Sequence, residues 1–263
     1  MRDLGEELDR LVADAVAVPL SGWDFSALDG RTVSEPLPWD YLALARAAAG
    51  RARRVLDVDT GGGEVLVAVG PPRGSVAVEP YAPNVGVAAA ALAPYGVEVR
   101  PRTGARLPVE DGAVDLVLNR HGALDPAEAF RVLEPGGLLL TQQVGRDNER
   151  EINDALGVPP ADVGGLASAR TARALLGAAG FEVLRSEEAR PRTRYLDVGA
   201  LVLQLRAVAW QVPGFDPVRH RDGLRRVHAQ VVRDGGFAVT GHRLLLLARR
   251  PDRARAGRGE LRG

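Results

Sequence analysis

Residues 53–66 read RRVLDVDTGGGEVL, and this stretch decides the fold. The apolar run at 55–58 is typical of a buried strand, three glycines follow at 61–63, and Glu64 begins an apolar segment of helical character. A strand, a glycine turn and a helix start are typical of a nucleotide site in a doubly wound α/β fold. Glycines let a ligand lie against bare main chain, and free N–H groups at the helix start face it. Asp57 would suit a ligand that brings an ammonium group to this turn.

The composition favours one large domain, or one domain with an inserted cap. The chain has 263 residues, of which 46% are hydrophobic, and a formal net charge of zero, so we expect neither nucleic acid nor membrane as partner. Without cysteine there is no thiolate zinc site, and we expect no metal. The N-terminal segment lacks the apolar core of a signal peptide, and a run of about 18 apolar residues is missing, which predicts the cytoplasm.

Strands and helices alternate from residue 55 to residue 144. The strand at 75–78 ends at Glu79, and an acid about 20 residues past the glycine turn is the expected partner of ribose hydroxyls. One carboxylate can accept two hydrogen bonds from a diol. The alternative is a surface acid, which the preceding strand disfavours. Further strands are predicted at 96–100, 113–118 and 138–144, and helices at 41–49, 85–93 and 126–133.

This alternation predicts right-handed crossovers and a ligand beyond the carboxyl ends of the strands. After a helix at 167–179 and a strand at 181–186, two helical segments at 195–210 and 217–233 precede a last strand at 237–247. We predict an α/β fold with a doubly wound, mostly parallel seven-stranded sheet and an antiparallel last strand. The predicted parts are an N-terminal helical cap (1–50), a cofactor-binding core (51–190), an inserted helical lid (191–235), the final strand of the core (236–249) and a disordered tail (250–263).

Two segments before the first strand leave alternatives open. A helix at 3–17 has one apolar face, which favours packing on the main domain over binding a partner. The segment 21–41 shows little periodicity. Trp39 and Tyr41 close it directly before the helix that leads into the first strand, so they would lie near the glycine turn. They either line a substrate pocket or only pack.

Over about residues 53–248 the chain resembles the class I methyltransferases that use S-adenosylmethionine. The resemblance is carried by VLDVDTGGGE, VAVEP, DLVLNRHG, the LEPGG turn and a terminal strand after a helix. It implies S-adenosylmethionine as cofactor, a small-molecule acceptor, and N-terminal and lid segments that close over the acceptor. We expect a monomer or homodimer. By position, it implies cofactor contacts from Asp57, Asp59, Thr60, Gly61, Gly62, Gly63, Glu79, Pro80, Gly104, Ala105, Arg106 and Leu107, and main-chain contacts from Asn119 and Arg120.

Two positions depart from the family pattern. The first glycine of acid-x-Gly-x-Gly-x-Gly is Asp59 here, and aspartate tolerates a positive φ better than most residues but at some cost. Its carboxylate could attract the sulfonium and ammonium groups or repel the ligand's carboxylate, and we expect Asp59 to weaken cofactor binding. In Thr103-Gly104-Ala105 the acid that often precedes the small residue at the adenine is missing, so a side-chain contact to the exocyclic amine is not expected.

Methyl transfer is an in-line displacement at an activated carbon, so the protein aligns the nucleophile and removes a proton where the acceptor needs it. His121 follows the strand at 113–118 and is the candidate base, because histidine titrates near neutrality. The alternative is a loop histidine that only packs or caps. The candidate acceptor contacts are Trp39, Tyr41, His121, Arg194, Tyr195 and His220.

Three functions remain compatible with these residues. The predicted one is a methyltransferase acting on an O, N or C centre of a small molecule. A non-catalytic or repurposed S-adenosylmethionine-binding relative is favoured by Asp59 and the missing adenine-side acid. A nicotinamide-dependent oxidoreductase is allowed by the glycines and Glu79, but the turn is not Gly-x-Gly-x-x-Gly.

Overall fold

The computed structural model describes residues 4–19, 25–160, 164 and 166–252. The described residues fall into two compact units, each built from separate stretches of the chain. The larger unit comprises Trp39–Val144, Gly164–Glu188 and Leu244–Gly263, and the smaller comprises Met1–Pro38, Gly145–Val163 and Ala189–Arg243. No described helix is long and apolar enough to cross a membrane.

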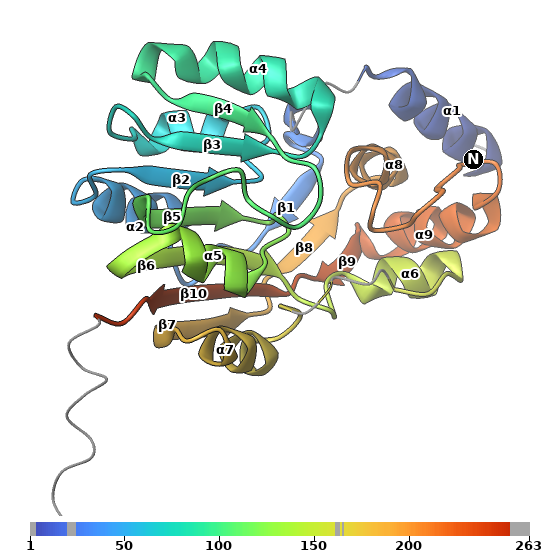
Figure 1. Ribbon diagram of the computed structural model, residues 1–263. Helices are drawn as coiled ribbons and strands as arrows, with labels where there is room; N and C mark the ends of the chain where they lie inside the picture. The colour runs from blue at the N-terminus through green and yellow to red at the C-terminus, as the bar shows by residue number, and fades with distance from the viewer. Residues whose placement is uncertain (1–3, 20–24, 161–163, 165, 253–263) are drawn as a thin grey trace, which may run out of the picture. The chain divides into compact units, whose positions relative to one another are not determined.

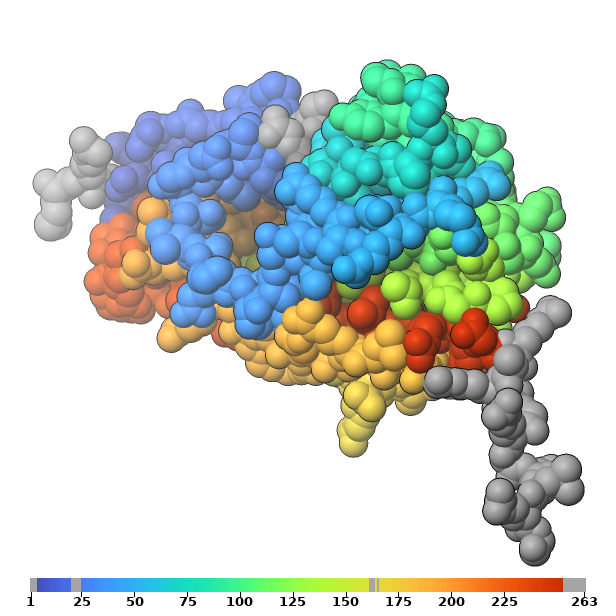
Figure 2. All heavy atoms as spheres, turned by 90° about the vertical axis from the view of Figure 1, so that its left-hand side faces the viewer, coloured from blue at the N-terminus to red at the C-terminus, as the bar shows by residue number. Residues whose placement is uncertain are grey.

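A seven-stranded sheet organises the described part of the larger unit. Its strand order is β4 (Glu98–Pro101), β3 (Val76–Glu79), β2 (Val55–Val58), β5 (Val114–Arg120), β6 (Leu133–Val144), β10 (Arg243–Arg249) and β7 (Glu182–Ala189). Every residue of β2 is buried, as expected for a central parallel strand whose two faces are covered. On the surface in Figure 2, the larger unit shows turquoise and blue segments above yellow-green, red and orange ones.

The sheet confirms the predicted fold class. β2 pairs in parallel with β3 and β5, and β5 with β6, whereas β10 is antiparallel. Just past the end of β10, Gly136 N–H donates to Arg250 O at 2.8 Å and Arg250 N–H donates to Gly137 O at 2.9 Å. Two residues thus oppose Arg250, and Gly136 is left-handed (φ 84°), which is the pattern of a bulge in an antiparallel pair.

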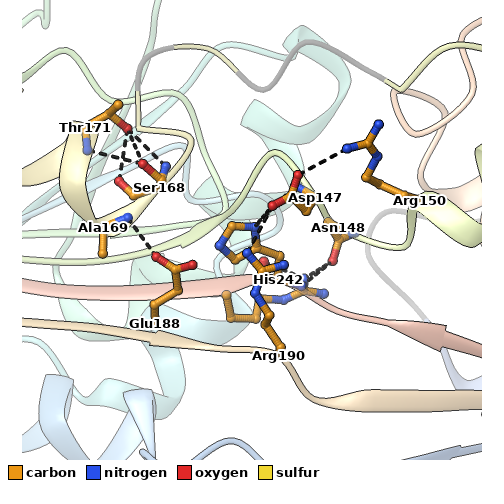
Figure 3. A network of polar contacts seen from close by, with 10 residues as sticks. Asp147, Asn148, Arg150, Ser168, Ala169, Thr171, Glu188, Arg190 and His242 are labelled. Carbon is orange, nitrogen blue, oxygen red and sulfur yellow. Dashed lines mark hydrogen bonds and ion pairs between the residues drawn. The ribbon is translucent and has the colours of Figure 1, made fainter.

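Helices cover both faces of this sheet. Figure 1 shows α2 (Tyr41–Ala49) and α3 (Glu64–Val69) on one face, and α5 (Pro126–Val132) and α7 (Ala169–Ala178) on the other, while α4 (Ala82–Leu92) contacts β4. The helix at 41–49 is confirmed with its predicted bounds. Side-chain caps fix several helix starts, which satisfies N–H groups that lack a partner inside the helix. In α7, Ser168 and Thr171 form a capping box (Figure 3).

The smaller unit has its own apolar core. Leu8, Leu201 and Val227 are at most 1% exposed, and they come from three different helices. Arg31 donates two hydrogen bonds to the Asp197 carboxylate, of which the bond from Nε to Oδ2 measures 2.9 Å. Asp197 also caps a helix by accepting from Ala200 N–H at 2.8 Å. The elements are α1 (Leu4–Ala17), η1 (Ser26–Leu28), α6 (Arg150–Leu156), α8 (Val198–Ala207), α9 (Arg221–Asp234) and, among the described residues, the antiparallel sheet β1 (Thr32–Ser34), β8 (Arg192–Tyr195) and β9 (Phe237–Thr240).

A polar network stabilises the turn before α6 in the smaller unit (Figure 3). The Asp147 carboxylate lies 3.0 Å from Arg190 and 3.5 Å from Arg150, and Asp147 N–H donates to His242 Nδ1 at 3.2 Å. The hydrogen bond from Arg190 lowers the pKa of Asp147. His242 is 1% exposed, so the ring is part of the packing of this turn.

The structure corrects the prediction of one final strand at 237–247. This segment forms two strands, because β9 pairs with β8 in the smaller unit and β10 joins the large sheet. Between the two strands, Gly241 N–H still donates to Pro191 O at 2.7 Å, beside the last pair of β8 and β9. A continuous apolar pattern does not reveal such a change of partner, because both strands need apolar residues.

Three other segments differ from the prediction. The segment 21–41 contains η1 and β1, while residues 20–24 lie outside the described residues. β6 already begins at Leu133, because the LEPGG backbone still pairs with neighbouring strands. In the predicted tail, Arg250 donates to Phe130 O at 2.9 Å and lies 4.6 Å from the centre of the Phe130 ring. Residues 253–263 of that tail lie outside the described part of the chain.

Candidate functional site

The glycine turn lies between β2 and α3, and Glu79 points at it. Gly61 and Gly63 take left-handed conformations (φ 65° and 89°) that favour glycine. Glu79 Oε2 accepts from Gly61 N–H at 2.7 Å, and Oε1 accepts from Tyr81 N–H at 2.8 Å. Since a carboxylate oxygen has two lone pairs, each can accept one further hydrogen bond, which is what a ribose diol requires. At Gly62 an added Cβ would meet only the Glu64 carboxylate, the flexible end of an exposed side chain.

Asp57 is a buried carboxylate at the end of β2. It is 6% exposed, and burial raises its pKa to about 7. The Thr60 hydroxyl opposes this rise, while the charges of Asp59 and Glu79 add to it. Tyr41 lies close by: its hydroxyl donates to Asn119 O at 3.3 Å, and burial together with the Asp57 charge raises the pKa of Tyr41. A cationic ligand beside Asp57 would favour its charged form.

Asp59 stands at the first glycine position with a left-handed backbone (φ 59°), as the family pattern implied. Its Oδ1 accepts from Arg102 Nη2 at 2.7 Å, and its Oδ2 accepts from Ala123 N–H at 2.7 Å. The side chains of Asp59 and Arg102 are 13% and 9% exposed. Burial raises the pKa of Asp59, and Arg102 acts against that rise. Asp59 therefore ties the glycine turn to the segment after β4 and to the loop after β5.

The loop after β4 is fixed at one end and exposed at the other. Gly104 (φ 80°) and the two residues after it are exposed. Leu107 is buried; its N–H donates to Glu128 Oε2 at 2.8 Å, and Arg131 Nη2 donates to its carbonyl at 2.9 Å. The Arg131 hydrogen bond lowers the pKa of Glu128. Contact of this loop with an adenine stays a prediction.

Asn119 uses its side chain to join three strand ends. Asn119 Nδ2 donates to Val58 O at 2.9 Å, while Oδ1 accepts from Thr141 Oγ1 at 2.9 Å and from the Gln143 amide. The residue is fully buried, and the next one, Arg120, is exposed. The side chain of Asn119 is thus structural, and the expected main-chain contacts of both residues to a ligand stay predictions.

Trp39, Gln142 and His121 form a hydrogen-bonded chain in the larger unit. Trp39 Nε1–H donates to Gln142 Oε1 at 2.8 Å, and Gln142 Nε2 lies 2.8 Å from His121 Nε2. Trp39 is buried, whereas His121 is exposed and left-handed (φ 61°). The structure therefore brings together two of the residues that the sequence nominated for the acceptor side.

Three of the nominated acceptor contacts, Arg194, Tyr195 and His220, belong to the smaller unit. Tyr195 is 2% exposed in its apolar core, which favours a packing role. Arg194 is exposed on β8. The His220 ring stacks on Phe215 with centroids 5.5 Å apart, and its Nδ1 lies 2.9 Å from Asp216 O. Contact of these residues with an acceptor stays a prediction.

Sequence reasoning missed Arg102 and Gln142. The substitution of Asp59 for a glycine was the available signal for Arg102, because a buried acid needs a cation within reach. The signal for Gln142 was the polar pair in TQQV, since amides at the end of a buried strand need partners. Neither signal names the partner, which comes from a distant part of the sequence.

Comparisons with solved structures give the fold a name. No model of a protein family matches the sequence, and no curated protein matches it. A Bacillus halodurans C-125 protein with a provisional methyltransferase assignment is 18% identical, with 80% of this chain and 98% of that chain covered and a TM-score of 0.57. YcgJ from Bacillus subtilis is 17% identical over 81% and 98%, with a TM-score of 0.56. The [4+2]-cyclase SpnF is 19% identical over 95% of both chains, with a TM-score of 0.51. Together with the strand order, these likenesses show that the chain has the class I methyltransferase fold.

Proposed function

We propose that this chain is an S-adenosylmethionine-dependent methyltransferase with a small-molecule acceptor. The observation that supports it most is the direction of Glu79, whose carboxylate meets Gly61 N–H at 2.7 Å at the glycine turn. An acid directed away from the turn could not serve a ribose bound there. When bound, the cofactor supplies a methyl group on a sulfonium, which is activated for displacement.

The residues of the larger unit divide into a cofactor side and an acceptor side. Glu79 binds the ribose hydroxyls, and the turn Gly61–Gly63 lets the ligand approach the main chain. Asp57 pairs with the ammonium group, which compensates a carboxylate whose pKa burial has raised to about 7. On the acceptor side, Trp39 and His121 are held together through Gln142. The chemistry left to the protein is alignment of the nucleophile with the methyl carbon.

Thermal unfolding with three ligands tests the cofactor. S-adenosylmethionine and S-adenosylhomocysteine are expected to raise the unfolding midpoint, and NAD is not, because only a ligand of the folded state stabilises it. Glu79→Gln is expected to reduce the rise. Glu110→Gln, a change at an exposed acid, serves as the matched control and is expected to keep it. A response to NAD alone would identify a nicotinamide-dependent enzyme instead.

A repurposed relative is the second candidate, and the Asp59–Arg102 pair favours it. This ion pair and the bond to Ala123 N–H connect three loops at the carboxyl edge of the sheet, where the family pattern has a glycine. The neighbour SpnF is described as a [4+2]-cyclase, so its fold carries a reaction other than methyl transfer. Product analysis with phenols, amines, thiols and carboxylic acids separates the two: cofactor binding without any methylated product supports the repurposed relative.

A further inference from the structure

Trp39 and His121 lie on opposite sides of the Gln142 side-chain amide, each within hydrogen-bond distance of it. Gln142 and Trp39 are 2% and 7% exposed, and both side-chain contacts of the amide measure 2.8 Å. A backbone hydrogen bond joins the same two strand ends, because His121 N–H donates to Gln142 O at 2.8 Å. The amide is thus oriented by protein groups.

The donors and acceptors of this chain allow one arrangement. The indole N–H of Trp39 is a donor only, so it must face the oxygen of Gln142. The amide NH2 then faces His121, and His121 Nε2 must accept. A neutral imidazole that accepts at Nε2 carries its proton at Nδ1. With a proton on Nε2, the His121 N–H and the Gln142 NH2 would both be donors and could not bond. If the amide were flipped, its NH2 would instead face the Trp39 N–H, which is also a donor.

We infer that Gln142, oriented by Trp39, fixes His121 as the neutral Nδ1–H tautomer, so that the ring is a hydrogen-bond donor and not the general base of the reaction. The backbone of His121 is left-handed (φ 61°), and its N–H is held by Gln142 O at 2.8 Å. Such a conformation is uncommon outside glycine and persists where the surroundings determine it. Gln142 and Trp39 are then positioning residues.

This tautomer limits the acceptor class, a consequence that rests on the proposed methyltransferase function. The Nε2 lone pair is engaged by Gln142, so His121 does not take a proton from the acceptor. A carboxylate or thiolate needs no base: its lone pair forms the bond to the methyl carbon, while the carbon–sulfur bond breaks and its electrons stay on sulfur. A neutral amine gives an ammonium product that loses its proton to water afterwards. An alcohol, which must lose its proton during transfer, would need a base other than His121.

Nitrogen–proton correlation spectra of 15N-histidine-labelled protein at pH 7 test the tautomer without cofactor or substrate. The wild type is expected to show His121 in the Nδ1–H form. Gln142→Glu places an acceptor against Nε2 and is expected to move the proton there. Trp39→Phe removes the donor that orients the amide and is expected to give a mixture. Trp210→Phe is the matched control, because it changes a half-exposed indole that is not part of the Trp39–Gln142–His121 network.

Two results would overturn the inference: Nε2–H or imidazolium in the wild type, or an unchanged His121 signal in folded Gln142→Glu protein. Neither touches the methyltransferase proposal, which fails separately if S-adenosylmethionine does not bind. Once an acceptor is known, His121→Asn gives a second readout, because its amide can donate near the place of Nδ1. A donor role predicts product formation within about tenfold of the wild type, whereas loss of a base would cost about 10²–10⁴-fold.

Discussion

Cofactor binding is expected to release a proton from Asp57. Burial raises the pKa of this carboxyl to about 7 in the free protein, and a bound ammonium group would lower it. Below pH 7 most of the free protein carries the proton, which must leave before the ion pair forms. Affinity for a ligand with an ammonium group therefore rises with pH and levels off above pH 7.

The size of this effect follows from the same pKa. If the bound carboxyl stays ionised throughout, affinity grows about fifteenfold between pH 5.5 and pH 7, or roughly 1.6 kcal/mol. An α-amino group has a pKa of about 8, so the ligand keeps its charge over this range. The unliganded fold responds in the opposite sense: ionised Asp57 destabilises it by up to about 4 kcal/mol, a loss that develops as pH rises from about 4 to about 7.

Isothermal titration calorimetry with S-adenosylhomocysteine measures the affinity and its dependence on pH. Titrations in two buffers of different ionisation enthalpy count the protons released at each pH. Asp57→Asn is the control: it should bind more weakly, show little dependence on pH and lack this proton release. A wild-type affinity that is flat or falls between pH 5.5 and pH 7 would refute the reasoning, since Asp57 would then not pair with the ligand's ammonium.

Four further substitutions have expected outcomes. Asp59→Gly relieves the left-handed aspartate and releases the loop after β5, so calorimetry should show tighter cofactor binding; equal or weaker affinity contradicts the role assigned to Asp59. Arg102→Gln leaves the nearly buried Asp59 carboxylate without its cation, and urea unfolding should show a loss of about 3 kcal/mol, whereas a loss under about 1 kcal/mol would mean that solvent screens the pair. Glu79→Gln should weaken S-adenosylhomocysteine binding about 10- to 100-fold, and an unchanged Kd would remove Glu79 from the ribose site. Asp197→Asn removes the carboxylate that accepts from Arg31, while asparagine can still cap the helix, and should lower the free energy of unfolding by about 1–2 kcal/mol in the same urea assay.

The large sheet was predictable because its signals are local. β2, its glycine turn and the acid that ends β3 lie within one continuous stretch, and apolar strands alternate with helices along the chain. The sheet of the smaller unit was not predictable. β1 is three residues long, and its last two residues are exposed. It forms because Thr32 pairs with Tyr195, far away in the sequence. A short strand formed by distant partners leaves no periodicity to read.

The same distinction applies to the candidate site. Positions within the glycine turn follow from spacing, so Asp59 could be flagged as a departure from the pattern. The cation that pairs with Asp59 could not be named, because Arg102 is 43 residues away in the sequence. Only the strand order brings the ends of β2 and β4 close together. The tautomer of His121 likewise depends on which donor faces Gln142, and that is a matter of geometry rather than of residue type.

The place of β10 has a consequence for synthesis of the chain. This strand lies between β6 and β7, although both are made long before it. Until the ribosome has released residues beyond Arg249, each of these neighbours presents a row of unpaired N–H and C=O groups. Open edges of this kind recruit other chains. A nascent or prematurely terminated polypeptide that stops before Arg243 is therefore most exposed to aggregation. The facing edges of β6 and β7 are paired only when β10, the last of the seven strands to be synthesised, takes its place.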